Sequence, residues 1–140
     1  MEREIITTRL TLMIKYIDRF QKFESITLPD YLDNFDYQLI AERLIQLLVE
    51  AASDINSYLL LQLHNITPST YYDSFIEAGK QGIISLELSR KLAQSAGMRN
   101  RLVHQYEEID NIIVYQSFPK ALTQYTLYIK EITTYLDSLE

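Results

Sequence analysis

Residues 34–64 set the architecture of this chain, and they read NFDYQLIAERLIQLLVEAASDINSYLLLQLH. Apolar residues recur every three or four positions through this segment, which is the period of a helix with one buried face. The residues on that face are Ile40, Leu44, Leu47, Leu48, Ala51, Ile55 and Tyr58. At 1.5 Å per residue the helix is roughly 45 Å long. The sequence Thr67-Pro68-Ser69 brings it to an end.

The segments on either side of this long helix also have a helical period. Residues 4–24 carry apolar residues spaced four, three, four and three positions apart. These residues are Ile6, Leu10, Met13, Ile17 and Phe20. The sequence Leu28-Pro29-Asp30 breaks this first helix. After residue 68 we expect a short helix of about residues 70–79, with Ser69 or Thr70 as its N-cap and Gly79 or Gly82 at its end.

Two more helices are predicted in the C-terminal half. Ser85 can cap a helix that reaches about Tyr106, and Asp110 is a suitable cap for the last one. The apolar residues of that last helix are Tyr115, Phe118, Leu122, Tyr125, Ile129, Ile132 and Leu136. Pro119 lies among them, so the helix either bends there or has the start of its main body there. We expect residues 1–140 to form a single all-α domain, an up-down bundle of four long helices plus a short one.

Composition narrows the class of protein. The chain has no cysteine, which excludes disulfides and thiolate metal sites. No uninterrupted apolar run reaches the ~18 residues of a membrane span, and the start Met-Glu-Arg-Glu does not resemble a signal peptide. We therefore expect a soluble cytoplasmic protein with no membrane partner.

Charge is unevenly distributed along the chain. The net charge is −6, but residues 80–104 carry five basic residues and one acidic residue, a net charge of +4. The remaining residues carry eight basic and eighteen acidic side chains. A basic segment in an otherwise acidic protein can bind a phosphate backbone, and it can equally be a solvent-exposed helix face.

The fourth predicted helix carries an arginine in its apolar stripe. At 100° per residue, that stripe consists of Leu88, Leu92, Ala96, Val103 and Tyr106. Arg99 falls within it, and a buried arginine needs an acidic or hydrogen-bonding partner. One explanation is a structural ion pair with Glu50 or Asp54 of the long helix.

A second face of the same helix combines small and polar residues. Ala93, Gly97, Asn100 and His104 lie along one flank of the apolar stripe. Glycine within a helix is destabilising by roughly 1 kcal/mol relative to alanine, so Gly97 suggests a closely packed partner helix. Arginine can grip a phosphate with a planar fork of donors, and histidine can move a proton near neutral pH. These are the two abilities that metal-free RNA cleavage requires.

Other kinds of site find little support. There is no Glu-x-x-His pair for a di-iron bundle, no glycine-rich phosphate loop and no pair of nearby histidines for zinc. We therefore expect no metal and no cofactor. His64 is interpreted as a helix-end residue. Tyr71 and Tyr72 could stack on nucleic-acid bases, although packing is the simpler explanation.

The pattern Arg99-Asn100-x-x-x-His104-x-Tyr106 in an all-α chain of this size resembles the HEPN superfamily. More narrowly, the chain resembles HepT, the ribonuclease toxin family of type VII HepT–MntA toxin–antitoxin systems. The similarity extends over nearly the whole chain. It includes residues 41–46 and 50–55 of the long helix, residues 97–104, and the exit Tyr106-Glu107-Glu108-Ile109-Asp110.

The resemblance implies a function with named residues. Family members are homodimers whose Arg-x4-His motifs meet at a cleft and cleave RNA, a tRNA or an mRNA, without a metal. Arg99 and His104 would be catalytic, with Asn100 and Arg101 positioning the phosphate. The products would carry a 2′,3′-cyclic phosphate and a 5′-hydroxyl. An MntA-type minimal nucleotidyltransferase antitoxin would neutralise the toxin by transferring AMP to Tyr106.

Two further expectations follow for the site and the dimer. Tyr106 lies seven positions after Arg99, so a continuous helix would point both residues to the same side. Ala93 and Gly97 would allow close approach of the two copies, with this helix near the two-fold axis.

Two alternatives to a ribonuclease stay open from the sequence. The chain could be a non-catalytic HEPN adaptor or the substrate-binding subunit of a nucleotidyltransferase. It could also be a helical interaction protein in which Arg99 makes only a structural ion pair. The intact set of Arg99, Asn100 and His104 favours the ribonuclease.

Overall fold

A computed structural model describes residues 1–140, and its centre is the 30-residue helix α3 (Phe35–His64). The side chain of Asn34 caps this helix by accepting a hydrogen bond from the Tyr37 backbone N–H at 3.1 Å. Asn65 ends it in the left-handed conformation, with φ of 54°. Asparagine tolerates this conformation better than most residues. The predicted bounds of the long helix are confirmed.

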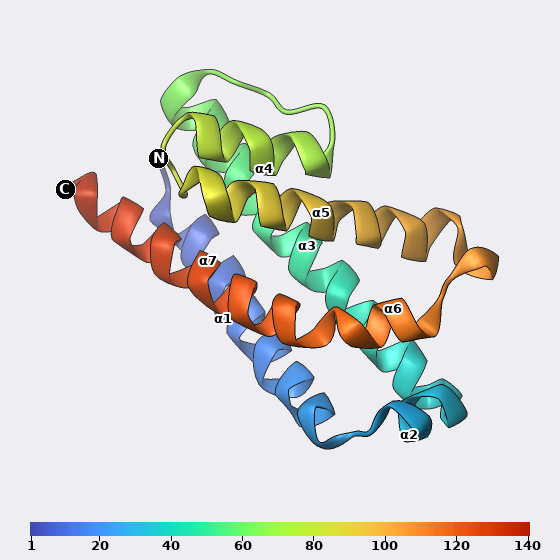
Figure 1. Cartoon of the computed structure of the whole chain (residues 1–140). Helices are drawn as coiled ribbons and strands as arrows, with labels where there is room; N and C mark the ends of the chain where they lie inside the picture. The colour runs from blue at the N-terminus through green and yellow to red at the C-terminus, as the bar shows by residue number, and fades with distance from the viewer.

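Four long helices form the bundle (Figure 1). Helix α3 lies against α1 (Arg3–Gln21) and α5 (Leu86–His104), and α7 (Phe118–Ser138) lies against both α1 and α5. The short helix α4 (Tyr71–Lys80) covers α3 and α5 at one end of the bundle. The all-α bundle of four long helices predicted from the sequence is confirmed.

Buried apolar side chains from all four long helices make one continuous core. The five residues predicted for the first stripe are all buried. Polar contacts also cross this core. The Tyr128 hydroxyl lies 2.6 Å from the Asn56 side-chain oxygen and 3.0 Å from the Ala52 carbonyl oxygen, and the Ser53 and Ser74 hydroxyls lie 2.8 Å apart. They join α3 to α7 and to α4.

The breaks between helices contain more structure than the sequence predicted. The Leu28-Pro29-Asp30 break is also the start of a short helix, α2 (Leu28–Asp33), which Thr27 caps.

Helix α6 (Asn111–Gln116) precedes α7, and Ser117 separates the two. Pro119 lies in the first turn of α7, so the main body of the last helix starts there. Proline fits the first turn because that N–H has no helical partner. Two short 3₁₀ segments, η1 (Lys22–Ser25) and η2 (Tyr106–Glu108), follow α1 and α5.

Helix α5 ends earlier than the expected Tyr106, and this changes where Tyr106 lies relative to the site. The helix stops at His104, two residues before Tyr106. The predicted buried stripe is correct for Leu88, Leu92 and Ala96, but it is wrong for Val103 and Tyr106, which are 40% and 45% exposed. Leu102 is buried in their place.

Helix α3 is long and apolar enough to cross a membrane by length and composition alone. However, 61% of its apolar window is buried within the bundle. Extensive burial of this kind is what the central helix of a helical bundle requires.

Candidate active site

An open cleft of about 430 Å³ lies beside the C-terminal end of α5. Three elements line it: the last turns of α5, the middle of α3, and the segment that leads into α4. The lining residues are Arg99, Asn100 and His104, then Ser53, Asp54 and Ser57, then Pro68, Ser69, Thr70 and Tyr71. The structure therefore brings together Arg99, Asn100 and His104, as the sequence predicted.

Helix capping places the two edges of the cleft. The Ser85 hydroxyl accepts a hydrogen bond from the Leu88 N–H and starts α5, whose last turns carry Asn100 and His104 one turn apart. The Thr70 hydroxyl accepts from the Asp73 N–H at 2.9 Å, so α4 begins at Tyr71. The cleft therefore lies between the end of one helix and the start of another.

Arg99 lies at the inner side of the cleft, with its side chain 15% exposed. Its Nη1 donates a hydrogen bond to the Asn100 side-chain oxygen at 3.2 Å, and its guanidinium carbon lies 4.5 Å from the centroid of the Tyr71 ring. Its Nε lies 3.9 Å from a Glu50 carboxylate oxygen and makes no hydrogen bond. An ion pair with Glu50 is thus present, but its length leaves donors of Arg99 unpaired.

The second acid considered as a partner of Arg99 has another role. Asp54 accepts a hydrogen bond from Arg9 of α1 at 3.3 Å, although it also lines the cleft. His104 is exposed as the last residue of α5, and its ring makes no hydrogen bond within the chain. A proton donor or acceptor from outside the chain can therefore approach it.

Arg101 and Tyr106 do not line this cleft. Arg101 borders a hollow beside α6 and α7, together with Met98 and Ile113. Tyr106 lies in η2, beyond the end of α5. The expectation that Tyr106 shares a side with Arg99 assumed a continuous helix, so that argument is wrong.

Tyr106 lies within reach of the charge of Glu42 on α3. Partial burial, and then the Glu42 carboxylate, raise the pKa of the Tyr106 phenol. Glu42 is itself 4% exposed, and burial raises the pKa of its carboxyl. The Tyr106 phenol therefore remains protonated at neutral pH.

The two small residues of α5 have different surroundings. Ala93 is fully buried within the chain, so the expectation that it meets a second copy is wrong. A methyl group added at Gly97 would meet nothing closer than Arg101 Nη1 at 3.8 Å, so no helix of the same chain explains this glycine. The close approach within the chain occurs at Gly79 of α4 instead, where a methyl group would collide with Ser89.

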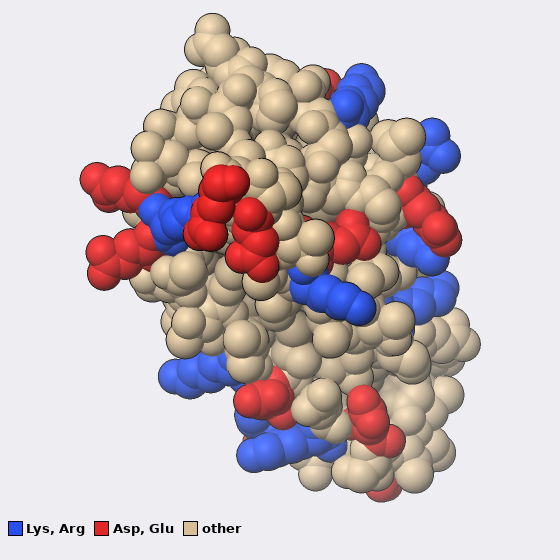
Figure 2. All heavy atoms as spheres, turned by 90° about the vertical axis from the view of Figure 1, so that its left-hand side faces the viewer, with Lys and Arg blue, Asp and Glu red and all other residues tan.

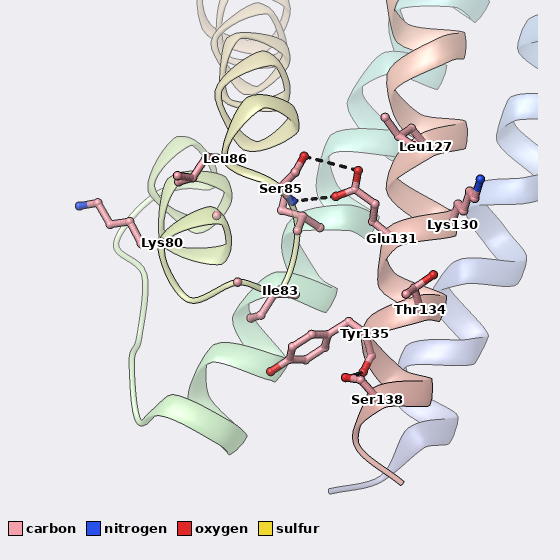
Figure 3. Close-up of a pocket in the computed structure, with 13 residues that line it drawn as sticks. Lys80, Ile83, Ser85, Leu86, Leu127, Lys130, Glu131, Thr134, Tyr135 and Ser138 are labelled. Carbon is pink, nitrogen blue, oxygen red and sulfur yellow. Dashed lines mark hydrogen bonds between the residues drawn. The ribbon is translucent and has the colours of Figure 1, made fainter.

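A second hollow, of about 810 Å³, lies away from this cleft (Figure 3). It lies between the turn that joins α4 to α5 and one side of α7. There the Glu131 carboxylate accepts hydrogen bonds from the Ser85 backbone N–H at 2.7 Å and from the Ser85 hydroxyl at 3.4 Å. Glu131 thus supports the start of α5, and its contacts are structural.

Neither the other histidine nor the charges on the face that carries both termini point to a second site. His64 ends α3, and its Nε2 lies 3.4 Å from the Tyr135 hydroxyl, as expected of a helix-end residue. Figure 2 shows acidic and basic side chains interspersed on the face that carries both termini, with no continuous basic surface.

Comparison with known proteins identifies the family of the chain. The family model described as Ribonuclease HepT-like matches residues 13–132. The chain is 48% identical over 139 residues to the tRNA nuclease HepT of Aphanizomenon flos-aquae (strain 2012/KM1/D3), covering 99% of this chain and 95% of that protein.

Solved structures show the same fold. The tri-AMPylated Shewanella oneidensis HEPN toxin in complex with MNT antitoxin superposes with a TM-score of 0.87 at 25% identity, over 96% of this chain and 99% of that one. A mutant of the toxin–antitoxin MntA-HpeT superposes with a TM-score of 0.83 at 25% identity, over 94% and 98% of the two chains. The chain belongs to the HepT-like ribonuclease family.

Proposed function

We propose that this chain is the toxin of a HepT–MntA toxin–antitoxin pair, a metal-independent endoribonuclease that acts on RNA in the cytoplasm. The observation that carries the proposal is the meeting of Arg99, Asn100 and His104 in one open cleft. The tRNA nuclease named among its relatives makes tRNA the first substrate to examine.

The chemistry assigns a role to each of these side chains. Arg99 and Asn100 hold the scissile phosphate while the ribose 2′-hydroxyl attacks phosphorus. The bond from phosphorus to the 5′-oxygen breaks, which leaves a 2′,3′-cyclic phosphate and a 5′-hydroxyl. One proton leaves the 2′-oxygen and one is delivered to the 5′-oxygen, and His104 carries out proton transfer.

A second copy of the chain would complete this site. A single cleft contains one histidine, whereas the reaction moves a proton at two oxygens. A two-fold dimer with α5 near its axis would bring together two copies of Arg99 and His104. Arg101 does not line the cleft of its own chain, so in this proposal it would contact RNA beyond the scissile phosphate.

The proposal is tested by measuring RNA cleavage in EDTA. His104→Ala should lower the rate by about 10²–10⁴-fold, as expected for loss of a general acid or base. His64→Ala is the matched control, because it removes the other histidine, which ends α3 outside the cleft, and it should leave the rate unchanged. Cleavage by His104→Ala at the parent rate, or loss of parent activity in EDTA, would contradict the mechanism.

We further propose that an MntA-type nucleotidyltransferase silences the enzyme by adding AMP to Tyr106. The Tyr106 oxygen would attack the α-phosphorus of ATP, and pyrophosphate would leave. A phenol is protonated at neutral pH, so a base of the partner must accept its proton. The phosphodiester then adds negative charge close to the motif in sequence, which opposes binding of an RNA phosphate.

Mass spectrometry after incubation with the antitoxin and ATP tests this modification. The parent chain should gain one or more AMP units at Tyr106, and Tyr106→Phe should gain none and keep its activity. Tyr72→Phe is the control, since Tyr72 is similarly exposed but lies on α4. If Tyr106→Phe is modified and silenced as well as the parent, the site of control is elsewhere.

A further inference from the structure

The guanidinium of Arg99 is held by groups from two other helices. The Tyr71 ring, at the first position of α4, lies under it at 4.5 Å, and the Glu50 carboxylate of α3 lies 3.9 Å from its Nε. We propose that Tyr71 is a positioning residue, whose ring fixes the Arg99 guanidinium in the orientation that grips the phosphate. This inference deepens the proposed function and rests on it.

The geometry of a guanidinium explains why an aromatic ring suits this role. All its N–H donors lie in the plane of the group, whereas an aromatic ring attracts the cation through its face. Tyr71 therefore holds Arg99 without using a hydrogen-bond donor. Only Nη1 is engaged in a hydrogen bond, to Asn100. Nε is buried beside Glu50, so the Nη hydrogens that are not bonded to Asn100 are the donors left for two oxygens of a phosphate.

The Tyr71 ring is itself held firmly. Thr70 caps the helix that Tyr71 begins, and the ring packs against the hydrophobic core. Its hydroxyl makes no hydrogen bond, unlike the hydroxyl of Tyr128. Its ring is therefore the part that acts on Arg99.

This arrangement also bears on the possibility that Tyr71 stacks on an RNA base. The face toward Arg99 is already covered by the guanidinium, so it is closed to a base. The neighbouring Tyr72 is 50% exposed and does not line the cleft. If Tyr71 stacked on a base, loss of its ring would raise KM for RNA and leave the orientation of Arg99 unchanged.

Two substitutions at position 71 separate the ring from its hydroxyl. Tyr71→Phe keeps the ring and should cleave RNA within about two-fold of the parent. Tyr71→Leu removes the aromatic face and should lower kcat about ten-fold with little change in KM. Tyr72→Leu is the matched control and should behave as the parent. Tyr71→Met, closer to the original ring in length, replaces the leucine variant if that variant does not fold.

The Nε–H resonance of Arg99 in a ¹H–¹⁵N spectrum gives a readout independent of catalysis. Arg99→Lys identifies the resonance by its loss. The ring current of an aromatic face at 4.5 Å should shift it upfield in the parent and in Tyr71→Phe, and the shift should vanish in Tyr71→Leu. An unshifted parent resonance, or a leucine variant with parent kcat, would overturn the inference.

The same measurements keep this inference distinct from the proposed function. If the parent does not cleave RNA, the proposed function fails, and a ring-current shift that depends on the aromatic ring still reports whether Tyr71 holds Arg99. If the parent cleaves RNA and Tyr71→Leu raises only KM, the ribonuclease stands and Tyr71 binds a base.

Discussion

Arg99 shows how a charged side chain can be partly buried and remain free to act. Its Glu50 partner is one-third exposed and too distant for a hydrogen bond, and ion pairs of that kind contribute about 0–1 kcal/mol. A phosphate can accept two charge-assisted hydrogen bonds from the same fork, which is a stronger interaction. Glu50 can therefore pair with Arg99 in the free protein, and an RNA phosphate can replace it as the partner of Arg99.

The space around Gly97 predicts that adding one methyl group there stabilises the isolated chain. In the isolated chain, Gly97→Ala adds a methyl group where there is space, and it removes the flexibility of a glycine within a helix. We expect the free energy of unfolding, measured in urea, to rise by about 0.5–1 kcal/mol. Gly79→Ala is the contrasting control, because its methyl group collides with Ser89 and should lower stability.

The same position reports on the proposed dimer. Light scattering at micromolar concentration should give about twice the 16.5 kDa of one chain. If the Gly97 face of α5 forms the interface, Gly97→Leu should shift this mass toward 16.5 kDa through overpacking. A parent mass of 16.5 kDa would exclude the dimer.

At the scale of the elements, the sequence predicted helices best where a cap and a periodic stripe coincide. Ser85 caps the helix expected of it, and Thr70, one of the two residues considered for the short helix, caps α4. Helix α2 was missed because a proline is equally compatible with the end of one helix and the first turn of the next. A local pattern cannot separate these outcomes, since the choice depends on packing against α3 and α6.

The sequence predicted the relative positions of site residues only where those residues lie on the same helix. Angular positions place Asn100 and His104 on one flank because both lie within α5. The same calculation fails for Tyr106, since the chain leaves the helical path at Gln105. The contact of Tyr71 with Arg99 joins residues 28 positions apart on different helices, and no local pattern encodes it.

At the scale of the whole molecule, three fully buried tyrosines contribute to the centre of the bundle. Tyr128 donates to α3, and the Tyr125 hydroxyl lies 2.8 Å from that of Ser95 on α5. The Tyr31 hydroxyl is buried with no partner. Burial raises the pKa of all three phenols, with smaller increments from Glu42 at Tyr31 and from Tyr125 at Tyr128.

These raised pKa values predict a loss of stability in alkaline solution. Above a pH of about 10 the phenols ionise in the unfolded chain but stay protonated in the folded one. The unfolded state then binds fewer protons, so the free energy of unfolding falls as pH rises, by about 1.4 kcal/mol per pH unit for each such tyrosine. Urea unfolding at about pH 9 and pH 11 measures this fall.

Comparison of two phenylalanine variants assigns the alkaline effect to burial. Tyr125→Phe removes one phenol that ionises only on unfolding, so the stability of this variant should fall less steeply between the two pH values than that of the parent. Tyr72→Phe removes an exposed phenol and should leave the parent's slope unchanged. Equal slopes for the parent and Tyr125→Phe would mean that Tyr125 ionises without unfolding. Its hydroxyl would then reach water through opening of the contact between α5 and α7, and α5 is the helix that positions Arg99 and His104.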